Sequence, residues 1–198
     1  MGTGPLPVTD QGLFPAEHRA LRELYALARQ LGGHWARLAD RLDPAPEVLD
    51  RGVAASKELL AELGGRTAAY GLHGVPAATG AGVWTSRLRG AGDLFLERNQ
   101  ALRSSVLDIQ HVVTLVAYLG ALAAKRNDTE LAAWHHGWEV RLTVLRDDIH
   151  AAAVAEADDP ERAVEAYDGS KLGRAGHKIA VGLGTLGEAF DGRAAKRH

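Results

Sequence analysis

Apolar residues recur at spacings of three and four along most of the chain, a pattern that predicts helices with one buried side each. The first stripe begins near Pro15, a residue suited to the first turn of a helix. It consists of Leu21, Leu24, Ala28, Leu31, Trp35, Leu38 and Leu42. A proline-rich turn at residues 43–46 precedes a second stripe, with Pro46 at the start of the helix. That stripe consists of Val48, Gly52, Ala55, Leu59 and Leu63.

Two longer helices are expected over residues 93–125 and 127–157. The apolar positions of the first alternate in four- and three-residue steps, which is typical of near-parallel bundle packing. They are Phe95, Asn99, Leu102, Val106, Ile109, Val113, Val116, Gly120 and Ala123. The inward positions of the second are Trp134, Trp138, Leu142, Leu145, Ile149 and Ala152. Asn127 and Glu130 fit the first and last positions of a capping box, and the short link predicts an antiparallel hairpin.

The predicted fold class is all-α: an up-down helical bundle of four long helices plus one or two shorter C-terminal helices. The shorter helices are expected near residues 160–167 and 170–190. We expect a flexible N-terminal arm (1–13), a single helical-bundle domain (14–191) and a basic C-terminal tail (192–198), since 198 residues suit one domain. The glycine-rich segment 71–92 has the length of a lid or binding loop.

Composition narrows the classes of function. A hydrophobic share of 46% beside 24% charged residues is typical of a globular protein. The net charge of -2 provides no broad attraction to nucleic acid, so we expect no nucleic-acid partner. The absence of cysteine excludes disulfides, thiolate zinc sites and a cysteine nucleophile. The N-terminus lacks a signal-peptide pattern and the apolar stretch 112–124 is short for a membrane span, so we expect a cytoplasmic protein. The excess of Arg over Lys is typical of GC-rich bacterial genomes.

The most specific chemical pattern is a pair of Asp-x-x-His motifs. Asp108 and His111 form the first, and Asp147 and His150 share a face in the second. A carboxylate and an imidazole so spaced can bind a metal ion or exchange a proton. The turn between the two helices centres near residue 127, so position 108 lies opposite about position 146. The four residues are therefore a candidate metal site at one level of the bundle.

This pattern resembles, in part, that of the ferritin-like di-iron bundles. Those proteins carry Glu-x-x-His on two helices and a lone Glu on each of the other two. The resemblance implies Fe or Mn as the metal, with Glu23 and either Glu58 or Glu62 as the lone carboxylates. The chain departs from the family pattern because Asp has a shorter reach than Glu and because the two motifs lie on adjacent helices. A structural polar cluster or a solvent-facing arrangement is the alternative, with Arg146 neutralising a neighbouring carboxylate.

Three other patterns have structural interpretations that we favour. In the segment 134–139, two tryptophans around two histidines suggest a ligand pocket, or core anchors with the histidines at the bundle edge. The Gly-x-Gly-x-x-Gly run at 182–187 is similar to a dinucleotide-binding turn, yet too few residues follow for a βαβ unit. A helix that packs closely or a docking tail explains its glycines better. Arg29 and His34 form an Arg-x4-His pattern of some helical ribonuclease domains, a match frequent by chance.

No strong catalytic motif is present, so the leading expectation is a non-enzymatic or accessory bundle. Such a protein acts by associating with a protein partner or as a homo-oligomer, and no cofactor is expected. The first alternative is a metal-dependent bundle enzyme that uses the two Asp-x-x-His motifs. The second is a protein that binds a small apolar ligand between its helices, below the segment 71–92.

Overall fold

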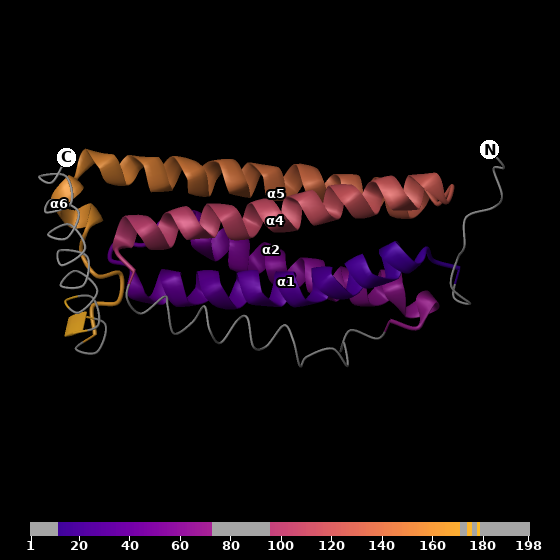
Figure 1. Cartoon of the computed structure of the whole chain (residues 1–198), viewed down its shortest axis with the longest axis horizontal. Helices are drawn as coiled ribbons and strands as arrows, with labels where there is room; N and C mark the ends of the chain where they lie inside the picture. Colours follow the sequence, from indigo (N-terminus) through magenta and orange to yellow (C-terminus); the bar gives the residue numbers. More distant parts are fainter. Residues whose placement is uncertain (1–11, 73–95, 171–173, 176–177, 179–198) are drawn as a thin grey trace, which may run out of the picture.

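Four long helices lie side by side and account for most of the described chain (Figure 1). The computed structural model describes residues 12–72, 96–170, 174–175 and 178. The long helices are α1 (Pro15–Arg41), α2 (Val48–Thr67), α4 (Arg98–Lys125) and α5 (Thr129–Ala155). Three short helices are η1 (Ala68–Tyr70), η2 (Glu156–Asp158) and α6 (Pro160–Ala163). Within these ranges there is no β-strand, and the prediction of an all-α bundle is confirmed.

The turn between α4 and α5 differs by one residue from the predicted capping box. Asp128, rather than Asn127, is the N-cap of α5, and its side chain accepts a hydrogen bond from the backbone N–H of Leu131 at 3.0 Å. Asn127 has a φ of 63° and closes the turn in the left-handed conformation, which Asn tolerates better than most residues. The predicted N-cap is therefore wrong by one residue: Asp128 caps α5, and Asn127 lies in the turn before it.

Helix α4 begins at Arg98 rather than near residue 93, and α6 ends at Ala163 rather than at residue 167. These two differences have one cause. The backbone N–H of Arg98 donates to the carbonyl of Glu165 at 2.8 Å, and that of Tyr167 donates to the carbonyl of Leu96 at 3.3 Å. The two segments pair with each other in extended form instead of continuing as helices. Helix α2 begins at Val48, two residues after Pro46.

Each long helix runs antiparallel to both of its neighbours. Between α1 and α4, His34 contacts Asp108 and Glu17 contacts Arg126, so numbers rise on one helix as they fall on the other. The α2–α5 contacts follow the same rule, as do those of α1 with α2. In chain order the directions are therefore up, down, down and up. Helices α2 and α4 run the same way, so one ends and the next begins at opposite ends of the bundle, as in bundles with one long connection.

The predicted apolar stripes form the core. All seven stripe residues of α1 and all five of α2 are buried. Gly52 is required at its position, because a Cβ atom there would lie 2.0 Å from Cε3 of the Trp35 ring. Helix α4 is long and apolar enough to cross a membrane by length and composition. In this bundle its core residues, including Ile109 and Val116, are fully buried among the other helices.

Several sequence predictions fall outside the described residues. They are the loop over 73–92, nearly all of the final helix over 170–190, the Gly-x-Gly-x-x-Gly run, the tail 192–198 and the first eleven residues of the arm. Leu13, the last residue of the predicted arm, is fully buried in the core.

Candidate functional site

The predicted ligands Asp108 and His111 lie on the side of α4 that contacts α1. Oδ2 of Asp108 is 2.9 Å from Nδ1 of His34, and both side chains are largely buried. Nε2 of His111 is 3.4 Å from Oε1 of Glu23, and both of those side chains are at least half exposed. The first motif is therefore engaged by α1 rather than by the second motif on α5.

Asp147 and His150 lie on the outer side of α5. The Asp147 side chain is 63% exposed and accepts a hydrogen bond from Nη2 of Arg146 at 2.7 Å. His150 is exposed. Nη1 of Arg146 also donates to Oε1 of Gln110 on α4, at 3.1 Å. Arg146 neutralises Asp147, as the structural alternative anticipated.

The hairpin count that suggested a common level is correct. Gly120 packs against Ala132 and His135 across the α4–α5 interface, and Gln110 contacts Arg146, as the predicted register requires. The count fixes height along the bundle, but not the direction of each side chain. Nowhere among the described residues do three His, Asp or Glu side chains gather in a group that could hold a metal ion. The four predicted ligands are not brought together.

Of the predicted lone carboxylates, Glu23 lies beside His111, whereas Glu58 and Glu62 have other partners on α5. Oε2 of Glu62 accepts hydrogen bonds from the indole N–H groups of Trp134 and Trp138, at 2.7 and 2.9 Å. Oε2 of Glu58 lies 2.5 Å from Nη2 of Arg141, and this hydrogen bond lowers the pKa of Glu58. Two further ion pairs, Arg51 with Asp148 and Arg66 with Glu130, lie on the same seam. We call these contacts the α2–α5 ladder.

The segment 134–139 splits between the interior and the surface. Trp138 is buried, which confirms it as a core anchor, and His136 is exposed at the bundle edge. His135 contradicts the prediction that both histidines lie at the edge, because it is 1% exposed. Among the described residues neither of its ring nitrogens has a hydrogen-bond partner, and the ring of Trp134 lies edge-on to it, with the two ring centroids 4.8 Å apart. Burial lowers the pKa of His135 to about 4, against a weaker opposing effect of Asp128.

The remaining candidate, the Arg29 and His34 pattern, is divided in the same way. His34 is buried and bonded to Asp108, whereas Arg29 is exposed. An imidazole held by a carboxylate is a familiar arrangement for proton transfer. It is also an ordinary way to satisfy a polar group between two helices.

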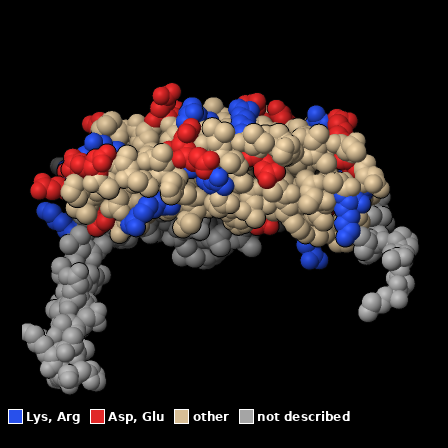
Figure 2. All heavy atoms as spheres, turned by 90° about the horizontal axis from the view of Figure 1, so that it is seen from above, with Lys and Arg blue, Asp and Glu red and all other residues tan. Residues whose placement is uncertain are grey.

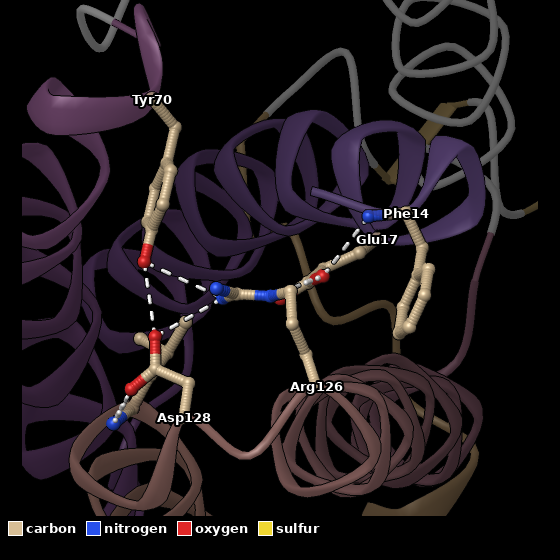
Figure 3. A network of polar contacts seen from close by, with 6 residues as sticks. Phe14, Glu17, Tyr70, Arg126 and Asp128 are labelled. Atoms are coloured by element: carbon tan, nitrogen blue, oxygen red, sulfur yellow. Dashed lines mark hydrogen bonds and ion pairs between the residues drawn. The ribbon is translucent and has the colours of Figure 1, made fainter. Parts of the chain in front are cut away.

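One end of the bundle is closed by a network around Arg126 (Figure 3). The guanidinium of Arg126 donates to both carboxylate oxygens of Glu17, each at 3.2 Å, and to Asp128 at 3.1 Å. The Tyr70 hydroxyl donates to the same Asp128 oxygen at 3.0 Å. Burial opposes the charge of Arg126, but its hydrogen bonds to Glu17 and Tyr70 outweigh that effect and raise its pKa. The network joins the start of α1, the end of α2 and the α4–α5 turn.

A second network closes the opposite end. The Arg98 guanidinium donates to Glu156 at 2.7 Å and to the backbone carbonyl of Pro44 at 2.6 Å. The Arg98 and Glu156 side chains are 6% and 11% exposed. Both end networks thus bind helices to one another with nearly all of their charged groups satisfied.

The outer side of α5 carries exposed apolar residues that take no part in the contacts described above. Of the exposed residues of α5, Glu130, Arg141 and His150 lie at the edges of this side, and eight others recur at helical spacing along a strip that we call the α5 ridge. They are Ala133, His136, Gly137, Val140, Val144, Asp147, Ala151 and Val154. The three valines are 53%, 53% and 59% exposed. In Figure 2, which shows the bundle from above, uncharged surface lies between charged side chains that gather along one long edge and in a small group near the middle.

The sequence contained a signal for the α5 ridge. Val140, Val144 and Val154 lie outside the inward stripe that begins at Trp134, so α5 is apolar on two sides.

Comparison of the chain with family models, with curated proteins and with solved structures gives no match.

Proposed function

We propose that this protein acts by associating with another protein through the α5 ridge. The observation that carries the proposal is the exposure of Val140, Val144 and Val154 on a single surface helix. The outer side of such a helix ordinarily carries polar and charged residues. Here the only formally charged member of the ridge is Asp147. An apolar surface strip beside polar edges is the usual composition of an association surface.

The α2–α5 ladder supplies a polar edge along one side of the ridge. Its members include Arg51 with Asp148 and Glu58 with Arg141, and the side chains of these pairs are 42% to 48% exposed. These pairs satisfy one another within the chain. A partner that covers the ridge therefore does not have to bury an unpaired charge along this edge, which would oppose binding.

The ridge supports an association of modest strength. Full burial of a valine side chain contributes about 1.5–3 kcal/mol, so covering three half-exposed valines contributes roughly 3 kcal/mol. Association opposes this with about 4–15 kcal/mol of lost translational and rotational freedom. The valines alone are insufficient, and the remaining contacts of the ridge and its edges must contribute as well. The expected complex is reversible.

Cysteine accessibility tests the proposal, because the chain has no cysteine of its own. Val144→Cys places a thiol on the ridge, and Val164→Cys is the matched control at a valine that is 49% exposed elsewhere. The labelling rate of each thiol by a membrane-permeant maleimide is compared between intact cells and dilute purified protein. We expect Cys at 144 to react several-fold more slowly in cells and Cys at 164 to react equally in both. Equal ratios at the two positions would contradict the proposal.

A further inference from the structure

We infer that the partner of the α5 ridge is a second copy of this chain, packed antiparallel about a two-fold axis at the level of Leu142. The inference rests on the proposed function and specifies its partner. It follows from the order of residues along the ridge. Residue 142 is the midpoint of α5 (Thr129–Ala155).

The ridge is nearly symmetric about that midpoint. Val140 and Val144 lie two residues on either side of Leu142, and Ala133 and Ala151 lie nine residues on either side. A two-fold axis across a helix exchanges positions at equal distances from the axis. It therefore places Val140 of one copy against Val144 of the other, and Ala133 against Ala151. Apolar residues thus meet apolar residues at these four positions, whereas Val154 comes opposite Glu130 of the second copy.

The same axis pairs the ridge's polar residues with compatible neighbours. Gly137 comes opposite Asp147 of the second copy, where the absence of a side chain leaves room for the carboxylate. His136 comes within one residue of the same Asp147. His136 and Asp147 are eleven residues apart, which is about three helical turns, so they lie on the same side of α5. Their side chains are 72% and 63% exposed. Within its own chain His136 lies 3.4 Å from Glu139, and Asp147 is paired with Arg146. The imidazole and the carboxylate can add a contact with each other across the interface, twice per dimer.

A parallel arrangement lacks these features. It would align each residue with its own copy, so that Asp147 would face Asp147. The parallel arrangement would lose the contact between His136 and Asp147, which are at different heights on α5. A contact between two copies about a two-fold axis requires such symmetry along α5, whereas binding to an unrelated protein does not. The symmetry and the contact between His136 and Asp147 both favour a second copy in the antiparallel sense.

The size of the contact sets the expected affinity. At 1.5 Å per residue, α5 is about 40 Å long, and a strip roughly 10 Å wide gives about 400 Å² per copy. A standard interface buries about 800 Å² per partner. The dimer is therefore expected to be weak, with dissociation in the micromolar range or above. The alanines and Gly137 permit close approach of the two helices, which brings residues at the edges of the ridge into contact.

Site-specific cross-linking tests the register. Ala133→Cys and Ala151→Cys are prepared separately, each in the otherwise cysteine-free chain, and oxidised at high concentration alone and mixed. In the antiparallel dimer the thiols of the two different variants meet, so the mixture forms disulfide-linked dimers. Either variant alone forms few, because identical positions lie about 27 Å apart along the axis at 1.5 Å per residue. Dimers from each variant alone would indicate a parallel arrangement and overturn the inference.

Sedimentation of the unmodified chain tests the oligomeric state independently. The Val140→Asp/Val144→Asp variant is expected to weaken the dimer by about tenfold or more, since 1.4 kcal/mol corresponds to tenfold. Val164→Asp is expected to leave it unchanged, and circular dichroism confirms that both variants are folded. An unmodified chain that is monomeric at the highest concentration, while Cys at 144 stays protected in cells, would refute the second copy but retain the association. A monomer without protection in cells would refute both.

Discussion

His135 combines full burial with an ionisable ring, and replacing it should change how the stability of the bundle depends on pH. His135 is 1% exposed, and its nitrogens have no hydrogen-bond partner in the part of the chain that the structure describes. In the His135→Leu variant an apolar side chain occupies the same space beside Gly120. A buried polar group without a partner costs about 1–3 kcal/mol. We therefore expect the variant to be more stable than the unmodified protein at pH 7 by about that amount.

The larger effect appears in acid. Burial lowers the pKa of His135 to about 4 in the folded protein, against an ordinary value of 6.5. Between these values the unfolded chain binds a proton that the folded chain excludes, so stability falls as pH falls. Each pKa unit corresponds to 1.36 kcal/mol, which gives a total loss of about 3 kcal/mol by pH 4. Above pH 6.5 this contribution is fully present and constant.

The assay is urea unfolding followed by circular dichroism at pH 7, 6, 5 and 4. Subtracting the free energies of the unmodified protein from those of His135→Leu removes the effects of other titrating groups. The difference should grow by about 3 kcal/mol from pH 7 to pH 4. His136→Leu is the control, because it removes a neighbouring imidazole whose side chain is 72% exposed rather than buried. If His135→Leu follows the unmodified protein in parallel across this range, the account of His135 is wrong.

Three further predictions concern packing, charge and metal. Glu17→Ala should lower the free energy of unfolding by about 3–5 kcal/mol, because the variant leaves the largely buried charge of Arg126 without its main partner. Glu23→Ala is the control on the same helix. The Glu23 carboxylate is 50% exposed, so this variant should change the free energy of unfolding by less than about 1 kcal/mol. Gly52→Ala should destabilise by about 1–3 kcal/mol through overlap with Trp35, whereas Gly65→Ala, with open space around it, should stabilise by roughly 0.5–1 kcal/mol. Both pairs are measured by urea unfolding, and equal effects within a pair would contradict the reasoning. Protein purified without a polyhistidine tag from iron-supplemented cells should contain clearly less than one metal per chain by elemental analysis, since its four predicted ligands diverge; stoichiometric iron or manganese would restore the metal hypothesis.

The helices and their buried sides follow directly from the sequence. Apolar residues at three- and four-residue spacings identify a buried stripe without any knowledge of the partner helix. The α1 stripe from Leu21 to Leu42 is correct at every position. Helix ends are less well determined, because they depend on contacts with distant segments. Arg98 begins α4 where its N–H pairs with Glu165, which is far along the chain.

The candidate site was harder to predict, because a spacing fixes height but not orientation. Asp108 and Asp147 are at similar heights, yet Asp108 turns to His34 on α1 and Asp147 turns outward. His34 could not be identified as the partner, since it lies 74 residues away on a helix whose position is set by the whole bundle. His135 and His136 illustrate the same limit. They are identical neighbours in the sequence, but His135 packs against Gly120 of α4 and is buried, whereas His136 is exposed.

The chain order up, down, down, up means that each half of the molecule is a hairpin of its own. Helices α1 and α2 form one hairpin, α4 and α5 form the other, and the apolar side of each is covered by the other. The two end networks, at Arg126 and at Arg98, both join one hairpin to the other. The bundle is therefore equivalent to a complex of two hairpins, α1–α2 and α4–α5, that are joined by a covalent link. The covalent link raises their effective concentration to roughly the millimolar range, and separately expressed hairpins should recombine when mixed.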